Sequence, residues 1–168
     1  MKRIAVYPGT FDPVTYGHVD LTERSLRMFD KVIIAIAANP KKAPLFTLEE
    51  RIDMFRRAIG KKHNVEIEGF DCLLVDYMKR KRAVGLIRGL RAVSDFEYEL
   101  QMALMNRRLD SSVETVFLMP SEEYSFITST IVKEAASYGG DVSSLVPKTV
   151  VEKLKRKFGN KQKCSAGS

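Results

Sequence analysis

The chain has 168 residues, of which 45% are hydrophobic and 29% charged, and 28 Lys and Arg against 21 Asp and Glu give a formal net charge of +7. This composition is that of about one globular domain, and it excludes disordered, collagen-like and disulfide-rich chains. A domain of this size buries enough surface to fold without a metal or disulfide staple.

Cysteine usage and hydropathy indicate a protein of the cytoplasm. Cys72 and Cys164 are far apart and have no metal-binding spacing, which favours a reducing compartment. The first apolar run is interrupted by Pro8 and Gly9, so it does not form a signal peptide. No stretch approaches the ~20 apolar residues of a membrane span, and we expect no membrane partner.

The positive charge is concentrated near the end of the chain. Residues 152–163 contain six basic residues and one acidic residue, a net +5 that leaves +2 for the rest. Basic tails sometimes bind nucleic acid, but most are solvated helix ends, and we expect no nucleic-acid partner. We predict a single domain over residues 1–158, followed by a basic, poorly ordered tail over 159–168.

Short apolar, β-branched runs alternate with segments of helical period along the chain. This pattern predicts an α/β fold with a five-stranded, doubly wound parallel sheet, and ligands at the carboxyl ends of its strands. The predicted strands are 4–7, 32–37, 65–70, 84–88 and 115–119.

Helices are predicted between these strands and after the last one. The second is the clearest, because Thr47 and Glu50 form a capping box and Gly60 follows an apolar stripe. The first helix carries an apolar stripe of Val19, Thr22, Leu26 and Phe29. Two other helices are predicted at 73–80 and 129–138, and a last one starts at Pro147. A further helix, predicted after the fourth strand, carries Phe96, Leu100, Ala103 and Leu104 on one face.

Phosphate chemistry is indicated after the first predicted strand. Neither of the common glycine-rich phosphate motifs stands there, but Gly9 and Thr10 make a tight turn, and Gly17 and His18 open the next helix. A glycine lets backbone amides approach an anion closely, and a helix start offers free N–H donors. We therefore favour a phosphate-binding role for His18 over a structural one.

Cations follow two other predicted strands. Arg88 and Arg91 flank Gly89 at the end of the fourth strand, and guanidinium groups bind phosphate through two parallel hydrogen bonds. Their position at a strand end favours a site over exposed ion pairs. Lys42, after the second strand, is a third cation on the same edge of the sheet.

A hydroxyl-rich segment, 120–130, follows the fifth predicted strand and leads into a helix that we expect Ser129 or Thr130 to cap. No Ser or Cys is paired with a histidine in the sequence, so a covalent mechanism is not expected. No set of residues has metal-ligand spacing, and we expect Mg²⁺ to arrive on the phosphates of a nucleotide.

Five segments together closely resemble the bacterial phosphopantetheine adenylyltransferase family of nucleotidyltransferases. They are GTFDPxTxGH at 9–18, LIRGLR at 86–91, FEYE at 96–99, MNR at 105–107 and SFITST at 125–130. The resemblance extends from about residue 3 to residue 158. Tyr16 departs from it, because a smaller polar residue is expected between the Thr and the Gly of TxGH.

The resemblance implies a Rossmann-like fold and transfer of AMP from ATP to 4'-phosphopantetheine, with Mg²⁺, in a homohexamer that binds coenzyme A as a feedback inhibitor. The implied catalytic residues are His18, as transition-state stabiliser, Thr10, Lys42, Arg88 and Arg91. The implied acceptor-binding residues are Thr10, Lys42, Leu74 and Arg88. The implied ATP-binding residues are Thr10, Phe11, His18, Gly89, Leu90, Arg91, Glu99, Tyr124, Ser125, Phe126, Ile127, Thr128, Ser129 and Thr130.

Two other functions are kept as alternatives. One is nucleotidyl transfer to a different phosphate, such as nicotinate mononucleotide or glycerol phosphate. The other is nucleic-acid binding through the basic segment that begins at Lys153.

Overall fold

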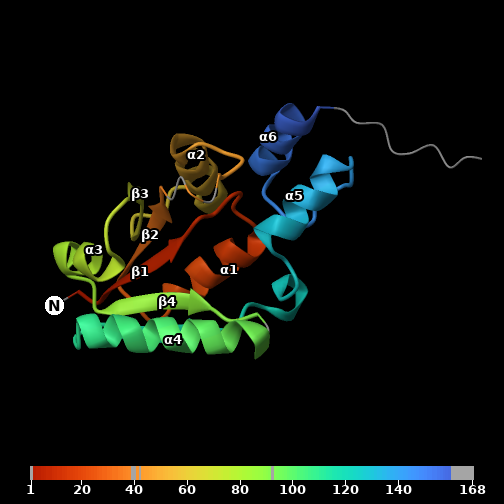
Figure 1. Cartoon of the computed structure of the whole chain (residues 1–168). Coiled ribbons are helices and arrows are strands. Elements are labelled where there is room, and N and C mark those ends of the chain that lie inside the picture. Colours follow the sequence, from red (N-terminus) through yellow and green to blue (C-terminus); the bar gives the residue numbers. More distant parts are fainter. Residues whose placement is uncertain (1, 39–40, 42, 92, 160–168) are drawn as a thin grey trace, which may run out of the picture.

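The computed structural model describes residues 2–38, 41, 43–91 and 93–159 (Figure 1). In chain order the elements are β1 (Ile4–Gly9), α1 (Tyr16–Ser25), β2 (Lys31–Ala37), α2 (Leu48–Ile59), β3 (Val65–Phe70), α3 (Leu74–Lys81), β4 (Gly85–Gly89), α4 (Val93–Leu109), β5 (Glu114–Leu118), the 3-10 turn η2 (Glu122–Tyr124), α5 (Ser129–Ser137) and α6 (Lys148–Phe158).

The five strands form one parallel sheet in the order β3-β2-β1-β4-β5. The chain therefore builds outward from β1 to β3, returns to place β4 against the other side of β1, and ends at β5. The direction of winding reverses between β1 and β4, and open sheets of this kind bind ligands at such a point. This confirms the predicted fold class.

Alternate side chains of the central strands enter two separate cores. On β1 and β2, Tyr7 and Ile34 pack with α1, α2, α5 and α6 on one face of the sheet. Val6 and Ile33 pack with α3 on the other face. Because helices cover both faces, these strands are apolar on both sides, which is why they appear in the sequence as nearly unbroken apolar runs.

The capping box predicted for α2 is present, since Thr47 accepts from the Glu50 amide and Glu50 accepts from the Thr47 amide. The first helix is shorter than its apolar stripe implied. It ends at Ser25, where Leu26 caps it, and the chain then turns so that Phe29 joins the core from outside the helix.

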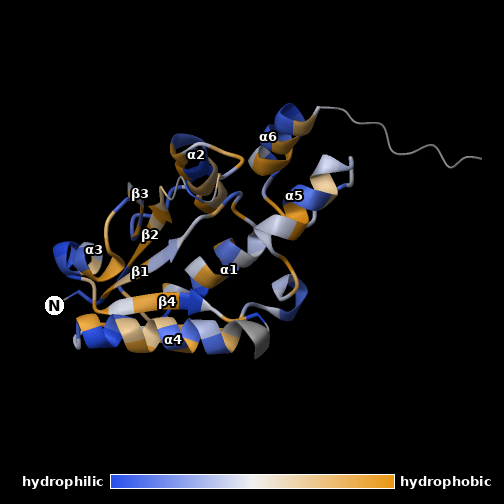
Figure 2. Cartoon of the chain, in the orientation of Figure 1, coloured by the Kyte–Doolittle hydropathy of each residue, from blue (hydrophilic) through white to orange (hydrophobic). Residues whose placement is uncertain are grey.

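Helix α4 differs from the other helices because its apolar residues do not gather on one face, and apolar and polar residues are interspersed along it (Figure 2). Phe96, Leu100 and Leu104, predicted to line one face, are each at least 39% exposed on the single chain. An amphipathic pattern cannot identify one buried side of such a helix.

Within the part of the chain that the structure describes, no helix is both long and apolar enough to cross a membrane. The predicted tail lies outside the described residues from position 160 onward, as does Cys164.

Candidate active site

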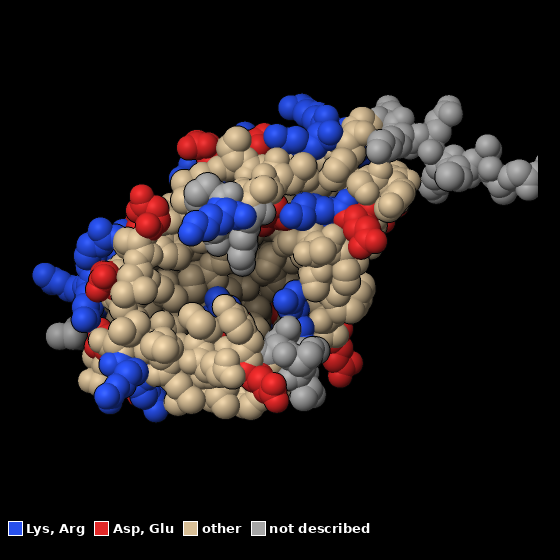
Figure 3. Space-filling view, viewed as in Figure 1, with Lys and Arg blue, Asp and Glu red and all other residues tan. Residues whose placement is uncertain are grey.

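A pocket of about 610 Å³ opens at the carboxyl ends of β1 and β4. Figure 3 shows it as a hollow with basic side chains in and around it. Its volume is in the range of small-molecule and cofactor sites. Its walls are Tyr7, Pro8, Gly9, Thr10, Phe11, Asp12, Thr15, Gly17, His18, Leu21, Pro44, Arg88, Gly89, Arg91, Glu99, Pro120, Tyr124, Ile127, Thr128, Ser129, Thr130 and Lys133.

The turn after β1 is shaped by Gly9 and Phe11. A Cβ atom at Gly9 would stand 2.8 Å from Cζ of Phe11, so only glycine lets that ring fold back over the strand end. Phe11 adopts a φ of 47°, which is unusual for a residue with a side chain. Its buried ring packs edge-on against the imidazole of His18, with 5.0 Å between the ring centroids, and this contact helps to fix the imidazole in place.

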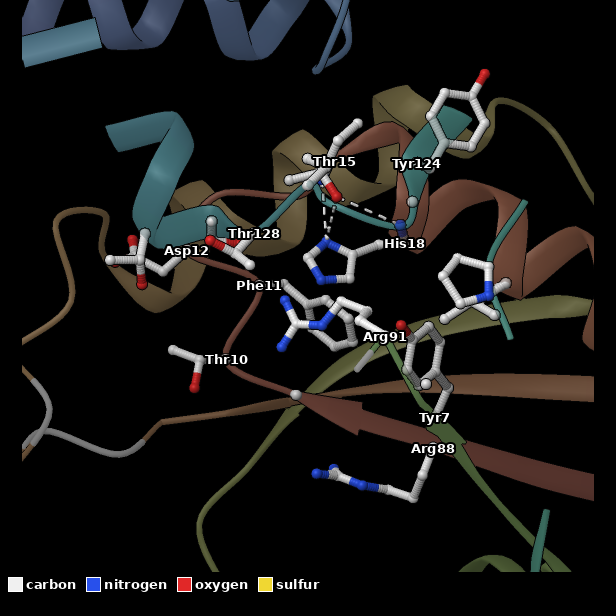
Figure 4. A pocket seen from close by; sticks show the side chains of 18 of the residues that line it. Tyr7, Thr10, Phe11, Asp12, Thr15, His18, Arg88, Arg91, Tyr124 and Thr128 are labelled. Atoms are coloured by element: carbon white, nitrogen blue, oxygen red, sulfur yellow. Dashed lines mark hydrogen bonds between the residues drawn. The ribbon is translucent and has the colours of Figure 1, made fainter. Parts of the chain in front are cut away.

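His18 is held by a capping box at the start of α1. Its Nδ1 accepts a hydrogen bond from the Thr15 amide at 3.0 Å, and its own amide donates to Oγ1 of Thr15 (Figure 4). A neutral imidazole has one donor and one acceptor, so a Nδ1 that accepts leaves the proton on Nε2. The ring therefore presents an N–H group to the pocket.

The charge state of His18 follows from its surroundings. Burial, reinforced by the nearby charge of Arg91, lowers the pKa of His18 from 6.5 to about 3. The imidazole is therefore neutral at physiological pH and acts as a hydrogen-bond donor, without carrying a positive charge.

Arg88 reaches the pocket from the end of β4 in a fixed orientation. Its Nε donates to Oε2 of Glu99 at 2.6 Å, its Nη2 pairs with Oε1, and its Nη1 donates to the Pro8 carbonyl. Burial alone would lower the pKa of Arg88, but the hydrogen bonds and charge of Glu99 raise it above its ordinary value. The guanidinium thus remains charged at the point where β1 and β4 meet.

The opposite wall is formed by the segment after β5. Thr128 caps α5 by accepting from the Ile131 amide, whereas Ser129 donates to the Pro13 carbonyl at 2.7 Å. The prediction that Ser129 or Thr130 caps this helix was therefore wrong: Thr128 has the extended backbone that a cap requires, and Ser129 is already helical.

A second link joins this wall to α1. Asp20 accepts hydrogen bonds from both the amide and the hydroxyl of Ser121, at 3.0 Å each. The helix that carries His18 in its first turn is thus tied to the segment after β5, although about a hundred residues separate the two in sequence.

The cytidylyltransferase-like family matches residues 6–135 of the chain. A phosphopantetheine adenylyltransferase of Carboxydothermus hydrogenoformans is 57% identical over 156 residues, which cover 93% of this chain and 96% of that protein. Another, of Caldanaerobacter subterraneus subsp. tengcongensis, is 52% identical over 156 residues, 93% of this chain and 98% of that protein. The chain belongs to the phosphopantetheine adenylyltransferase family.

The fold of this family member is shared more widely. The structure titled a putative nicotinate-nucleotide adenylyltransferase from Vibrio parahaemolyticus superimposes with a TM-score of 0.67 at 18% identity, over 96% of this chain and 98% of that one. This likeness confirms the nucleotidyltransferase-like fold.

The pocket of this phosphopantetheine adenylyltransferase family member gathers most of the residues implied by the resemblance. Leu74, Leu90, Ser125 and Phe126 do not line it: Leu74 packs on the α3 side of the sheet, and the other three belong to the connecting segments. Lys42 lies outside the described residues. Glu99, expected to hold ATP, is bonded to Arg88.

Tyr16, the residue at which the chain departs from the family motif, leaves His18 undisturbed. Its ring lies beside that of Tyr124, with centroids 6.2 Å apart, and the Thr15–His18 capping box is intact. The packing around Gly17 does not require a glycine, since a Cβ there would make only ordinary contacts at 3.6 Å.

Sequence reasoning missed several charged residues around the pocket. Asp12 is buried, accepts the amides of Leu45 and Phe46, and pairs with Lys133 of α5 at 2.7 Å. The third missed residue, Arg51, is buried behind the turn after β1. Its spacing could have revealed it, because it follows Leu48 by three residues and so lies on the apolar face of α2.

Proposed function

We propose that the chain transfers AMP from ATP to the phosphate of 4'-phosphopantetheine and releases dephospho-coenzyme A and pyrophosphate. The proposal rests on the name that the two relatives share and on one observation of this chain. The neutral His18 directs its N–H into a pocket where Arg88 and Arg91 supply positive charge.

The proposed mechanism is a direct in-line attack with no covalent intermediate. The acceptor phosphate is already an anion at neutral pH, so the reaction needs alignment and charge neutralisation more than a general base. Arg88 and Thr10 would bind the attacking phosphate, and His18 would donate to the α-phosphate as charge builds on its equatorial oxygens. Lys42 and Leu74 remain proposed acceptor contacts.

The nucleotide would occupy the side of the pocket built by Phe11, Gly89–Arg91 and the segment 124–130. We infer that ATP enters as its magnesium complex. Among the described residues no three His, Cys, Asp or Glu side chains form a metal cluster. The two carboxylates in the pocket wall, Asp12 and Glu99, are already engaged by amides and by cations. The ion would therefore be bound mainly by the phosphates, where it neutralises their charge.

The experiment that tests this function uses the purified chain, ATP, Mg²⁺ and 4'-phosphopantetheine, and follows pyrophosphate and dephospho-coenzyme A together. We expect both products in equal amounts, and none when EDTA is added. Pyrophosphate release with nicotinate mononucleotide or glycerol phosphate, and none with 4'-phosphopantetheine, would instead favour a related enzyme for another acceptor. Coenzyme A shares parts of both substrates, and we expect it to compete for the pocket.

We also propose that the chain assembles into a homohexamer in the cytoplasm, with α4 in its interface. Several large apolar side chains that lie exposed together on one helix of a single chain are typical of a surface that another protein chain covers. Its exposed apolar residues are Phe96, Tyr98, Leu100, Met102, Leu104, Met105 and Leu109.

Light scattering tests the assembly. The wild-type chain is expected to have the mass of six copies, and the double variant Leu104→Glu/Met105→Glu a smaller mass, because charged side chains oppose burial of the helix. The control is Tyr138→Glu, which replaces an exposed residue at the end of α5. An unchanged mass for the double variant would exclude α4 from the interface.

A further inference from the structure

Arg51 of α2 is the largest fully buried side chain of the described residues, with 1% of its surface exposed. It does not line the pocket. A charged side chain is costly to bury unless hydrogen bonds replace its hydration. All the hydrogen bonds of its guanidinium group within the described part of the chain go to backbone carbonyl oxygens.

These carbonyls belong to three segments that are separate in sequence. Nη1 donates to Thr10 after β1 and to Ala37 at the end of β2, both at 2.8 Å. Nη2 donates to Ala38 at 3.3 Å, and Nε donates to Phe46 and Thr47 before α2. The β1–β2 pairing ends at Gly9 and Ile36, so Arg51 joins the two strand ends just beyond it.

Asp12 complements Arg51 from the other side. It accepts the Phe46 amide at 2.9 Å, while Arg51 donates to the Phe46 carbonyl at 3.1 Å. Two buried groups of opposite charge therefore hold one buried residue. The charge of Asp12 also partly offsets the effect of burial, which lowers the pKa of Arg51.

The residue between these two anchor points is Phe11, whose φ of 47° is unfavourable for a residue with a side chain. A strained backbone persists only when its surroundings fix it from several directions. Arg51 fixes the carbonyl of Thr10 on one side of Phe11, and Asp12 is fixed by amides and Lys133 on the other. The turn that presents Thr10 to the pocket is thus held by Arg51, which lies outside the pocket, and by the pair of Asp12 and Lys133 in its wall.

We propose that Arg51 is a positioning residue for the acceptor side of the site, acting through the carbonyl of Thr10. The proposal rests on the function proposed above. Arg51 touches neither substrate. It fixes the turn from which Thr10 faces the acceptor phosphate, and none of its hydrogen bonds reaches Gly89–Arg91 or the segment 124–130, which build most of the ATP side.

The test compares Arg51→Met with Arg57→Met, which removes an exposed arginine from the same helix. Both are assayed at a temperature where circular dichroism shows them fully folded. For Arg51→Met we expect kcat/KM for 4'-phosphopantetheine to fall at least ~30-fold, since it loses the alignment of the attacking group, while the Kd for ATP changes by less than ~3-fold. Arg57→Met should match wild type in both.

Four results would overturn the proposal. One is a folded Arg51→Met with wild-type kcat/KM for the acceptor. Another is a Kd for ATP that rises by the same factor, because Arg51 would then support the whole pocket. If Arg51→Met does not fold, Arg51→Lys is judged by the same criteria, and failure of both to fold assigns Arg51 to folding alone. A wild-type chain that makes no dephospho-coenzyme A overturns the proposed function first, and this inference with it.

Discussion

Replacing His18 by alanine is expected to lower kcat at least ~100-fold while the Kd for ATP changes by less than ~10-fold. Its Nε2 proton is the donor that faces the pocket, because Nδ1 is engaged by the Thr15 amide. A donor aimed at charge that develops only in the transition state contributes little to ground-state binding. A ~100-fold loss corresponds to about 2.7 kcal/mol of transition-state stabilisation.

The natural control for this variant is His63→Ala, which removes the other, exposed histidine and should leave both constants unchanged. Steady-state turnover and calorimetric ATP binding give the two quantities. A variant that binds ATP poorly but keeps wild-type turnover would assign His18 to ground-state binding.

The low pKa of His18 makes the same experiment informative across pH. Because the folded-state pKa is about 3, the imidazole stays neutral from pH 5.5 to 8, and the ratio of wild-type to His18→Ala turnover should be constant over that range. Ratios that change with an apparent pKa near 6.5 would contradict a neutral donor.

The lowered pKa of His18 also makes the free energy of unfolding depend on pH. Between pH 6.5 and about 3 the unfolded chain binds a proton at His18 that the folded chain does not, so the free energy of unfolding is expected to fall as the pH is lowered through this range.

The parts of this architecture that sequence predicted are those encoded locally. The strand predicted at 32–37 is an apolar run of the right length, and the Thr47 capping box joins residues three apart. The positions of Arg88 and Arg91 followed from the rule that parallel strands end at one edge of a sheet.

What sequence missed depends on contacts between distant residues. Arg51 binds the Thr10 carbonyl across 41 positions, and Ser121 meets Asp20 across 101. No local pattern specifies such a pair. The cap of α5 was misplaced for a different reason, because Thr128, Ser129 and Thr130 are all good capping residues and only the backbone decides among them.

Replacing Arg88 by methionine is expected to weaken the acceptor step more than the ATP step, with kcat/KM for 4'-phosphopantetheine falling at least ~100-fold. The loss has two parts. The guanidinium no longer binds the acceptor phosphate, and Glu99, whose side chain is 11% exposed, becomes an unpaired carboxylate in the pocket wall. An unpaired carboxylate repels an incoming phosphate and is costly to keep charged.

The double variant Arg88→Met/Glu99→Gln separates these two parts. If Glu99 serves to orient Arg88, removing both charges should recover part of the activity that Arg88→Met alone loses, because the repulsive carboxylate is gone. Arg107→Met is the matched control, since Arg107 pairs with Glu114 on the exposed side of α4 and should leave acceptor kcat/KM unchanged. A double variant no more active than Arg88→Met would instead give Glu99 a contact of its own with a substrate, the role that the family resemblance implied. The pair thus decides whether the buried carboxylate in this pocket positions an arginine or binds a substrate directly.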